Sequence, residues 1–165
     1  MTVSSGQPNL APCALPQRRR TGSAAWSGLL AVALLIVSQP AWSVTCSSSA
    51  TGVSFGNYSV FSNADSDSAG SVSVSCDGIA SYSIALSPGN GTYSARRMAS
   101  GTNHLDYNLY REASRSTVWG DGTSGSSVVT GSGTAATHTV YGRIPSRQNV
   151  YAGSYSDNIV VTVSY

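Results

Sequence analysis

The chain has 165 residues, with nine arginines, no lysine and seven acidic residues, and only 10% of its residues are charged. Three of the arginines lie at positions 18–20, so residues 44–165 carry six arginines against seven acidic residues, a net charge of −1. This balance excludes the basic surface that nucleic-acid binding requires. A surface built from Ser, Thr, Gly, Asn and Tyr is typical of an extracellular structural protein.

The first 43 residues predict a signal peptide. The arginines at 18–20 form a positive segment, and the apolar run at 28–37 is too short to span a bilayer comfortably. Ala41-Trp42-Ser43 fits the small-x-small rule for signal peptidase, which places cleavage between Ser43 and Val44. We therefore expect no membrane anchor after cleavage. The long segment ahead of the apolar run leaves open whether translation starts at Met1 or downstream.

The cysteines indicate an oxidising compartment. Cys13 leaves with the signal peptide, and Cys46 and Cys76 remain. In an exported chain such a pair predicts one disulfide, and closing a loop of about 30 residues would stabilise the fold by ~3–4 kcal/mol. The alternative, a two-cysteine metal site, lacks a histidine or a second cysteine pair at ligand spacing.

Short β-runs separated by turn residues fill positions 44–165, and no segment there has helical periodicity. Apolar and polar residues alternate within the runs, as at Val72, Val74 and Cys76 on one face. The predicted strands, in chain order, are 53–61, 71–76, 82–86, 105–109, 117–119, 127–130, 137–144 and 157–165, with a loop at 63–70 and glycine-rich turns at 87–91 and 120–125. About seven strands at this spacing predict one all-β domain with an immunoglobulin-like sandwich.

The final run, 157–165, is the strongest β-pattern of the chain. Alternation places Ile159, Val161, Val163 and Tyr165 on one face. Sandwiches usually bury their last strand or trim it as a polar edge. An apolar terminal strand therefore predicts a sheet that awaits a partner strand from elsewhere.

Catalytic histidines are not indicated. His104 and His138 lie in predicted strands, and no Gly-x-Ser-x-Gly motif accompanies them. Glu112 is the one glutamate, and its neighbours Arg111 and Arg115 favour surface pairing over a hydrolytic carboxylate pair.

A cation site is not indicated either. Asp65 and Asp67 begin like a calcium loop, but Ala69 and Cys76 stand where later ligands are needed. We expect no catalytic, cofactor-binding or metal-binding residue, and hence no enzyme. Tyr93 and Tyr151 are candidates for exposed rings that contact sugars or surfaces.

In its ordered motifs the chain resembles the spore coat protein U domain, found in archaic (Csu-type) chaperone–usher pilus subunits and in secreted coat proteins. The resemblance covers nearly all of residues 44–165. It rests on Cys46 followed by VSFGNY at 53–58, GSVSVSC at 70–76, YSIAL at 82–86, LDYNLY at 105–110 before Trp119-Gly120, VYGRIP at 140–145, and GSYSD at 153–157 before VVTV at 160–163.

The resemblance implies a sandwich that lacks its final strand. A periplasmic chaperone lends a strand, and a neighbouring subunit replaces it at the outer-membrane usher, both by β-strand addition. On this basis Ile159, Val161, Val163 and Tyr165 would line the acceptor groove and contact the chaperone.

One departure from the polymerising pattern affects the expected role. After cleavage only Val44 and Thr45 precede Cys46, which is too short for a donor strand. We expect an exported, non-catalytic structural or adhesive subunit, tip-like or belonging to a coat that forms no pili. It would pass through the periplasm to the surface of a Gram-negative cell. The alternative is a self-contained secreted sandwich of a coat or matrix that binds carbohydrate or surfaces.

Overall fold

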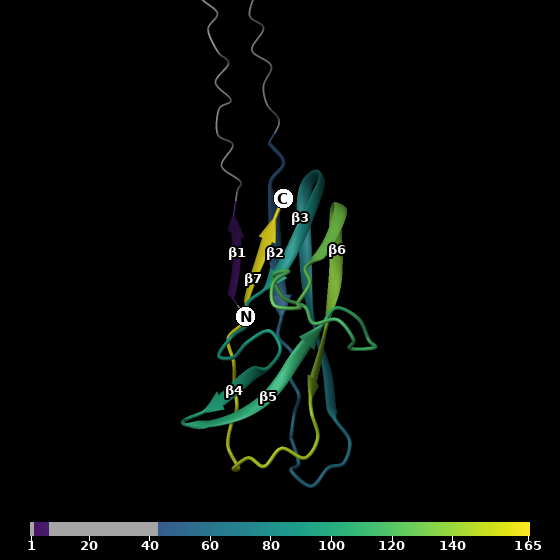
Figure 1. Ribbon diagram of the computed structural model, residues 1–165. Helices are drawn as coiled ribbons and strands as arrows, with labels where there is room; N and C mark the ends of the chain where they lie inside the picture. The colour runs from purple at the N-terminus through teal and green to yellow at the C-terminus, as the bar shows by residue number, and fades with distance from the viewer. Residues whose placement is uncertain (1, 7–42) are drawn as a thin grey trace, which may run out of the picture. The chain divides into compact units, whose positions relative to one another are not determined.

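The computed structural model describes residues 2–6 and 43–165, and within these the chain is all-β (Figure 1). The strands are β1 Thr2–Gly6, β2 Cys46–Thr51, β3 Ser66–Leu86, β4 Arg96–Ser100, β5 Asn103–Tyr110, β6 Val129–Ile144 and β7 Val160–Ser164. Over these two ranges no helix is long and apolar enough to cross a membrane. The predicted signal peptide lies outside the described residues, apart from Thr2–Gly6 and Ser43.

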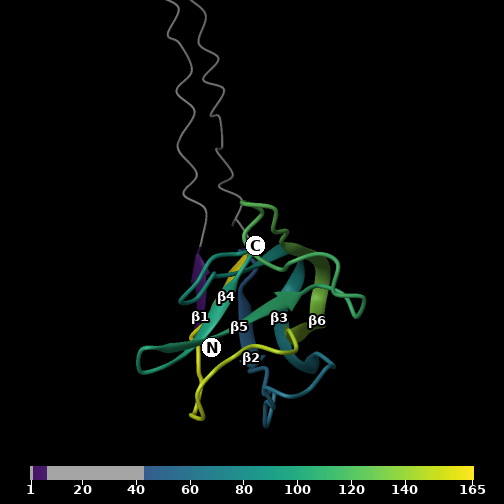
Figure 2. The ribbon, with the colours of Figure 1, turned by 60° about the horizontal axis from the view of Figure 1, so that its bottom comes forward.

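The 21-residue strand β3 organises the sheet. One edge pairs with β6 along most of its length, and the other pairs first with β2 and then, over Ser83 to Leu86, with β7. A register shift between Ser75 and Ala80 interrupts the β3–β6 ladder, and such irregularities bend and twist a strand. Beyond β6 the sheet continues through β5 to β4. Figures 1 and 2 both show this last hairpin inclined to the long strands, which gives the curled, two-layered form of an immunoglobulin-like sandwich.

The core follows from strict alternation along the strands. Val72, Val74, Tyr82, Ile84 and Leu86 of β3 are all buried, while the intervening serines lie on the other face. The buried apolar residues contributed by the rest of the chain are Cys46, Leu105, Tyr107, Leu109, Trp119, Val129, Val140, Ile144, Ile159, Val161 and Val163. The expected all-β sandwich is therefore confirmed.

Several expected strand limits are wrong. Residues 53–61 form no strand, because Gly56, with a φ of +67°, interrupts the run. Residues 66–70, expected in a loop, belong to β3, where Asp67 lies opposite Arg143 of β6. The separate runs at 71–76 and 82–86 are one strand, as are those at 127–130 and 137–144. Strand β4 carries too little apolar alternation to have been recognised.

The predicted pair Cys46 and Cys76 is bonded in the structure, with 2.04 Å between the sulfur atoms. The two residues are direct partners in the β2–β3 ladder. The bond therefore fixes the start of β2 to the middle of β3.

Candidate strand-acceptor edge and cleft

The residues of strand β7 alternate, as predicted, between the buried face and the exposed face of the sheet. Ile159, Val161 and Val163 are buried in the core, and Tyr165 packs partly against it. Val160 and Ser164 lie on the exposed face. The predicted apolar residues thus already form core, and any added strand would pair with the backbone of the β7 edge beside them.

That outer edge of β7 is occupied by β1. The two strands are parallel, and the register runs from Thr2 opposite Val160 to Gly6 opposite Ser164. Sequence reasoning missed this strand because it assigned the whole N-terminal segment to the leader. The pairing places β7 between β3 and β1, so the edge has the geometry to accept a strand.

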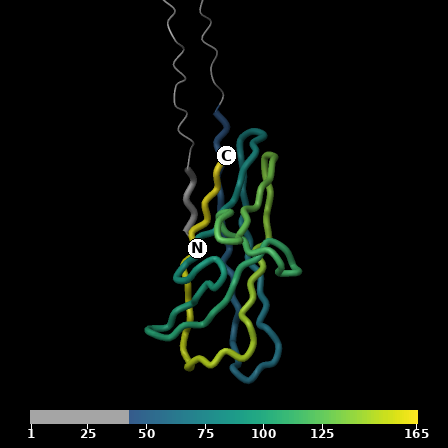
Figure 3. Tube along the Cα trace, viewed as in Figure 1, coloured from purple at the N-terminus to yellow at the C-terminus, as the bar shows by residue number. Residues whose placement is uncertain are grey.

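A cleft of about 1130 Å³ opens next to Ile159, the residue that precedes β7. Its walls are two segments outside the long strands, residues 52–61 and residues 150–157, which reach the same end of the domain (Figure 3). Its apolar lining comes mainly from Met98, Leu105, Tyr107, Leu109, Ile144 and Ile159. At 90% and 76% exposure, Phe61 and Tyr151 of the two walls are the most solvent-accessible aromatic side chains lining it.

The first wall is held by side chains. Among the described residues, no backbone–backbone hydrogen bond joins residues 53–58 to another segment. Instead Ser68 donates its hydroxyl to the carbonyl of Ser54, and Tyr58 donates to Pro145 at 2.9 Å. The wall lies close to β6 at Gly142, where an added Cβ would fall 2.7 Å from the Val53 and Phe55 side chains. The backbone groups facing the cleft are therefore free to pair.

The second wall is similarly sparse. Two backbone hydrogen bonds tie Ser156 to Ala99 of β4, at 2.8 and 3.1 Å. Over residues 150–155 the one hydrogen bond in the described part of the chain is donated by the Tyr155 hydroxyl to the carbonyl of Tyr151. Apart from the Ser156–Ala99 pair, the two walls thus offer backbone groups without main-chain partners beside an apolar lining, where an added strand could pair.

Asp157 fixes the position where the second wall meets β7. Tyr107 donates its hydroxyl to this carboxylate at 2.8 Å, and the backbone N–H groups of Asn90 and Asn158 donate to its other oxygen. Burial, together with the hydrogen bond to Asp157, raises the pKa of Tyr107 well above its usual range, so the phenol stays protonated. Gly89, with a φ of +65°, is required here because a Cβ would overlap the carboxylate.

A buried arginine lies next to the cleft, since Arg96 of β4 is the direct ladder partner of Tyr107. Arg96 has 0% exposure and donates to the side-chain oxygen of Asn108 and the carbonyl of Trp119, both at 2.7 Å. It also donates twice to the carbonyl of Ser87, and the Tyr93 ring lies 5.5 Å from its guanidinium carbon. Burial lowers the pKa of Arg96 from its usual value. No sequence pattern indicated this residue, because two adjacent arginines usually lie on the surface.

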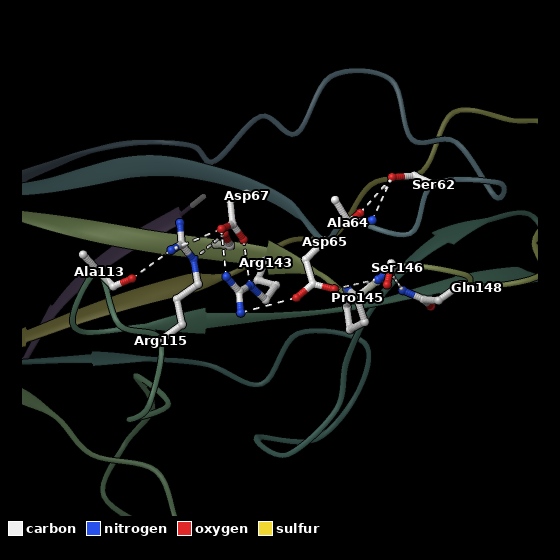
Figure 4. Close-up of polar contacts among 11 residues, drawn as sticks. Ser62, Ala64, Asp65, Asp67, Ala113, Arg115, Arg143, Pro145, Ser146 and Gln148 are labelled. Carbon is white, nitrogen blue, oxygen red and sulfur yellow. Dashed lines mark hydrogen bonds and ion pairs between the residues drawn. The ribbon is translucent and has the colours of Figure 1, made fainter.

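The residues that suggested a calcium loop belong to an ion-pair network (Figure 4). Asp67 accepts two hydrogen bonds from Arg143, at 2.7 and 2.9 Å, and lies 3.3 Å from Arg115. Asp65 pairs with the same Arg143 at 3.3 Å and accepts the backbone N–H of Ser146. The hydrogen bond from Arg143 is the main reason that the pKa of Asp67 is lowered. These carboxylates therefore bind arginine.

Other candidate residues have structural surroundings. Glu112 accepts hydrogen bonds from Ser116 and Thr117, so the expected pairing with Arg111 and Arg115 is not what the structure contains. His138 contacts the Tyr82 hydroxyl through Nε2 at 3.0 Å, and burial lowers its pKa. His104 is exposed on β5. In the described part of the chain neither histidine shares a hydrogen bond with a serine hydroxyl.

Comparison with known proteins places this geometry in context. A family model for the spore coat protein U domain matches residues 31–162. Protein U of Myxococcus xanthus is 37% identical over 108 residues, which cover 58% of this chain and 59% of that protein. The chain thus matches less than two thirds of its curated relative.

The fold has a solved counterpart. A chain of the CsuC–CsuE chaperone–tip adhesion subunit pre-assembly complex, from archaic chaperone–usher Csu pili of Acinetobacter baumannii, superimposes with a TM-score of 0.56 at 22% identity. The match covers 74% of this chain and 40% of that one, and at this identity it establishes the fold alone. Because the family model spans most of the sequence, this chain belongs to the spore coat protein U domain family.

Proposed function

We propose that this chain is an exported, non-catalytic subunit of a surface fibre or coat, assembled by a chaperone–usher pathway. Its acceptor site is the β7 edge together with the adjoining cleft. A periplasmic chaperone would supply a strand there first, and a neighbouring subunit would replace it at an outer-membrane usher. The coarse part of this proposal is supported by the family and by the fold shared with a chain of a chaperone–tip adhesion subunit complex.

One observation carries the acceptor assignment: two wall segments with few backbone hydrogen bonds, the Ser156–Ala99 pair apart, flank the apolar lining of a cleft next to Ile159. A strand inserted between them would gain main-chain hydrogen bonds on both sides. Its alternate side chains would pack against the partly exposed apolar residues that line the cleft, such as Val53, Phe55 and Met98, in the usual recognition mode of β-augmentation. Charge plays little part, because among the described residues Asp157 is the one charged residue that lines the cleft.

Supplying the strand covalently tests the site. An alternating valine–threonine extension of about ten residues, joined after Tyr165 by a short flexible linker, should fill the edge and the cleft. We expect an increase in Tm of at least about 5 °C and a higher periplasmic yield without any chaperone. The matched control is an extension of equal length that carries proline at alternate positions and cannot pair. Equal melting temperatures for the two fusions would contradict the proposal.

A tip-like position is the finer part of the proposal. Cleavage between Ser43 and Val44 would leave two residues ahead of Cys46, which favours a subunit that accepts a strand and donates none. N-terminal sequencing of the secreted protein tests this directly. A mature start ten or more residues upstream of Cys46 would instead favour a linking subunit.

A second candidate function, binding of neutral polysaccharide, is favoured by the outer face of the sheet. Across β2, β3 and β6 the register aligns Ser49, Ser73 and Thr137, and the next row aligns Thr51, Ser71 and Thr139. Neutral hydroxyls both donate and accept hydrogen bonds, as sugar hydroxyls do. Co-sedimentation with cellulose and chitin tests this function, and substitution of Ser73 by Glu should abolish binding while the same change at Ser114, outside these strands, should not.

A further inference from the structure

We infer that residues 135–140 of β6 form a lateral edge, at which two copies of this chain pair antiparallel through the same strand. The lateral edge lies apart from the proposed acceptor site. Strand β6 pairs with one side of β3, whereas β2 and β7 pair with the other side. A copy bound at the lateral edge therefore leaves β7 accessible to a donated strand.

Unpaired backbone at the lateral edge carries the inference. Toward β3, residues 135–140 pair in unbroken register with residues 75–70. On the other side, β5 pairs only with residues 141–143. In the described part of the chain, no hydrogen bond outside the β3 ladder reaches the backbone of residues 135–140. Alternate residues of an antiparallel strand direct their N–H and C=O groups to opposite edges, so this side offers a row of free groups. Figure 1 shows β6 at the rim of the domain, on the side away from β7.

The side chains of the lateral edge do not oppose pairing. Exposed edge strands usually carry lysine, proline or an inward-pointing charge that prevents contact between copies. Here the sequence is Ala-Ala-Thr-His-Thr-Val, with no carboxylate, arginine or proline. The one titratable group, His138, contacts the Tyr82 hydroxyl through Nε2 at 3.0 Å, and burial lowers its pKa. The edge is therefore uncharged at neutral pH.

Symmetry and side-chain size select one register. Pairing of a strand with its own copy has a two-fold axis, so one residue must face itself. An axis at Thr137 places Ala136 opposite His138 of the second copy, and Ala135 opposite Thr139 of the second copy. Each of these pairs joins a small side chain to a larger one on the same face. An axis at His138 would instead oppose two imidazole rings, so we place the axis at Thr137.

A second copy fits this edge better than an unrelated strand. Its small, neutral side chains give a foreign sequence little to recognise, and backbone hydrogen bonds supply most of the affinity in strand addition. In the same row, Thr137 shares a hydrogen bond of 2.9 Å with Ser73, which lies opposite Ser49 of β2. An axis at Thr137 continues this row of hydroxyls into the second copy. The inferred contact thus extends one polar face across both domains.

The expected affinity is low for two isolated domains. A single pair of short strands falls below the ~1,000 Å² typical of a stable interface. Repetition along a fibre or coat would strengthen the contact through multivalency, a step that rests on the proposed function. A weak, reversible dimer of the free protein is therefore the result to seek.

Sedimentation velocity of the protein exported from the full-length chain tests the lateral edge, at concentrations up to about 1 mM. We expect a reversible monomer–dimer equilibrium. Thr137→Lys, which brings two cations together at the axis, should lower the association constant about tenfold or more. The matched control is Ser49→Lys, which adds the same charge in the same row at the opposite side of the sheet and should change the constant less than about twofold. A protein that stays monomeric throughout, or equal effects of the two lysines, would overturn the inference.

Cross-linking tests the register with a milder substitution. In a Cys13→Ser background, a single Thr137→Cys should be joined between two molecules by a short bismaleimide, because directly opposed side chains lie about 5 Å apart. The native cysteines do not react, since Cys46 and Cys76 are bonded to each other. Ser49→Cys is the control, with an expected dimer yield about tenfold lower. Equal yields would overturn the pairing through Thr137 even if the lysine variant failed to fold.

The strand-filling fusion described above separates the lateral edge from the acceptor site. Filling the acceptor site should leave the dimer constant unchanged within about twofold, because the two edges lie on opposite sides of β3. Loss of the dimer in the fusion would show that copies meet through the acceptor site, which would overturn the inference. A dimer that depends on Thr137, in a fusion with no gain in Tm, would instead contradict the acceptor site and support the lateral edge.

Discussion

Two neighbouring regions of this sandwich, the surroundings of Arg96 and the cleft, differ in how completely their polar groups are paired. Around Arg96, the guanidinium donates to Asn108, Trp119 and Ser87, and the Trp119 indole N–H donates to Ile84 at 2.9 Å. Around the cleft, the two walls make few backbone hydrogen bonds, the pair between Ser156 and Ala99 apart, beside a largely apolar lining. The first region is a closed core in which polar groups are paired. The second is open, with apolar side chains and few backbone hydrogen bonds.

Stability and assembly therefore depend on different residues of one small domain: the Arg96 network for stability and the cleft for assembly. A buried polar network is costly to disturb, because each unpaired group loses hydration without compensation. An open, apolar-floored cleft gains free energy when a strand fills it. Substitutions in the closed region should therefore affect the fold, and substitutions near the cleft should affect it less until a donor is present.

The largest effect is expected at Arg96. Replacing it with Met removes the cation and leaves Asn108 and the Trp119 carbonyl buried without their donor, so the free energy of unfolding should fall by about 3–5 kcal/mol. Urea denaturation of the disulfide-intact protein measures this change. The control is Arg97→Met, since Arg97 forms a half-exposed pair with Asp106 at 3.1 Å and should change stability by less than about 1 kcal/mol. Equal losses for the two variants would contradict a dominant role of the buried Arg96 network in stability.

The disulfide comes next. Changing Cys46 and Cys76 together to Ser should lower the free energy of unfolding by ~3–4 kcal/mol, because the chain regains loop entropy in the unfolded state. The measurement is the same denaturation series. The bond joins β2 to β3 and neither cysteine lines the cleft, so the strand-filling fusion described above should restore Tm only in part. Full recovery on adding the strand would show that the bond and the missing strand stabilise the same region.

A smaller effect is expected where the cleft meets β7. Tyr107→Phe keeps the ring, which lies 6.0 Å from Phe55 edge to face, but removes the hydrogen bond to Asp157. The loss should be about 1–2 kcal/mol, since the carboxylate remains partly buried. Tyr110→Phe is the matched control, because its ring is partly exposed and should tolerate the change. If Asp157 positions the wall, the free energy of peptide binding to the acceptor edge should fall by more than the free energy of unfolding.

The sequence predicts the parts of this fold that alternation determines. The period of two correctly predicts which residues are buried: Val72, Val74, Ile84, Leu105, Val161 and Val163. It fails where pairing is supplied by distant backbone. Residues 66–70 form strand because β6 lies beside them, and residues 53–58 do not, because no strand in the described part of the chain pairs with them.

The candidate site was predictable in a similar, partial way. The terminal strand indicated an open edge, but the cleft requires contributions from 52–61, β5 and 150–157, which no local pattern connects. Arg96 and Asp157 were missed because a buried charge is recognised only from its partners in space. The β1 strand was missed because a short polar segment ahead of an apolar run predicts a leader and carries no strand signal.

The smallest effect is expected at the ion-pair network on the β3–β6 edge. The pKa of Asp67 is lowered in the folded protein, chiefly by its hydrogen bond from Arg143, so the pair stabilises the fold above the unfolded-state pKa near 3.9. As pH falls below that value, this stabilisation is lost through protonation. The carboxylate is more than a third exposed, so solvent screening limits the contribution to below about 1 kcal/mol. Asp67→Asn should therefore flatten the dependence of unfolding free energy on pH between about 4 and 2, while Asp121→Asn, on an exposed turn away from these strands, leaves the part due to Asp67 unchanged. A parent and an Asp67→Asn variant with parallel pH profiles would show that the network aligns the two strands without contributing measurable stability.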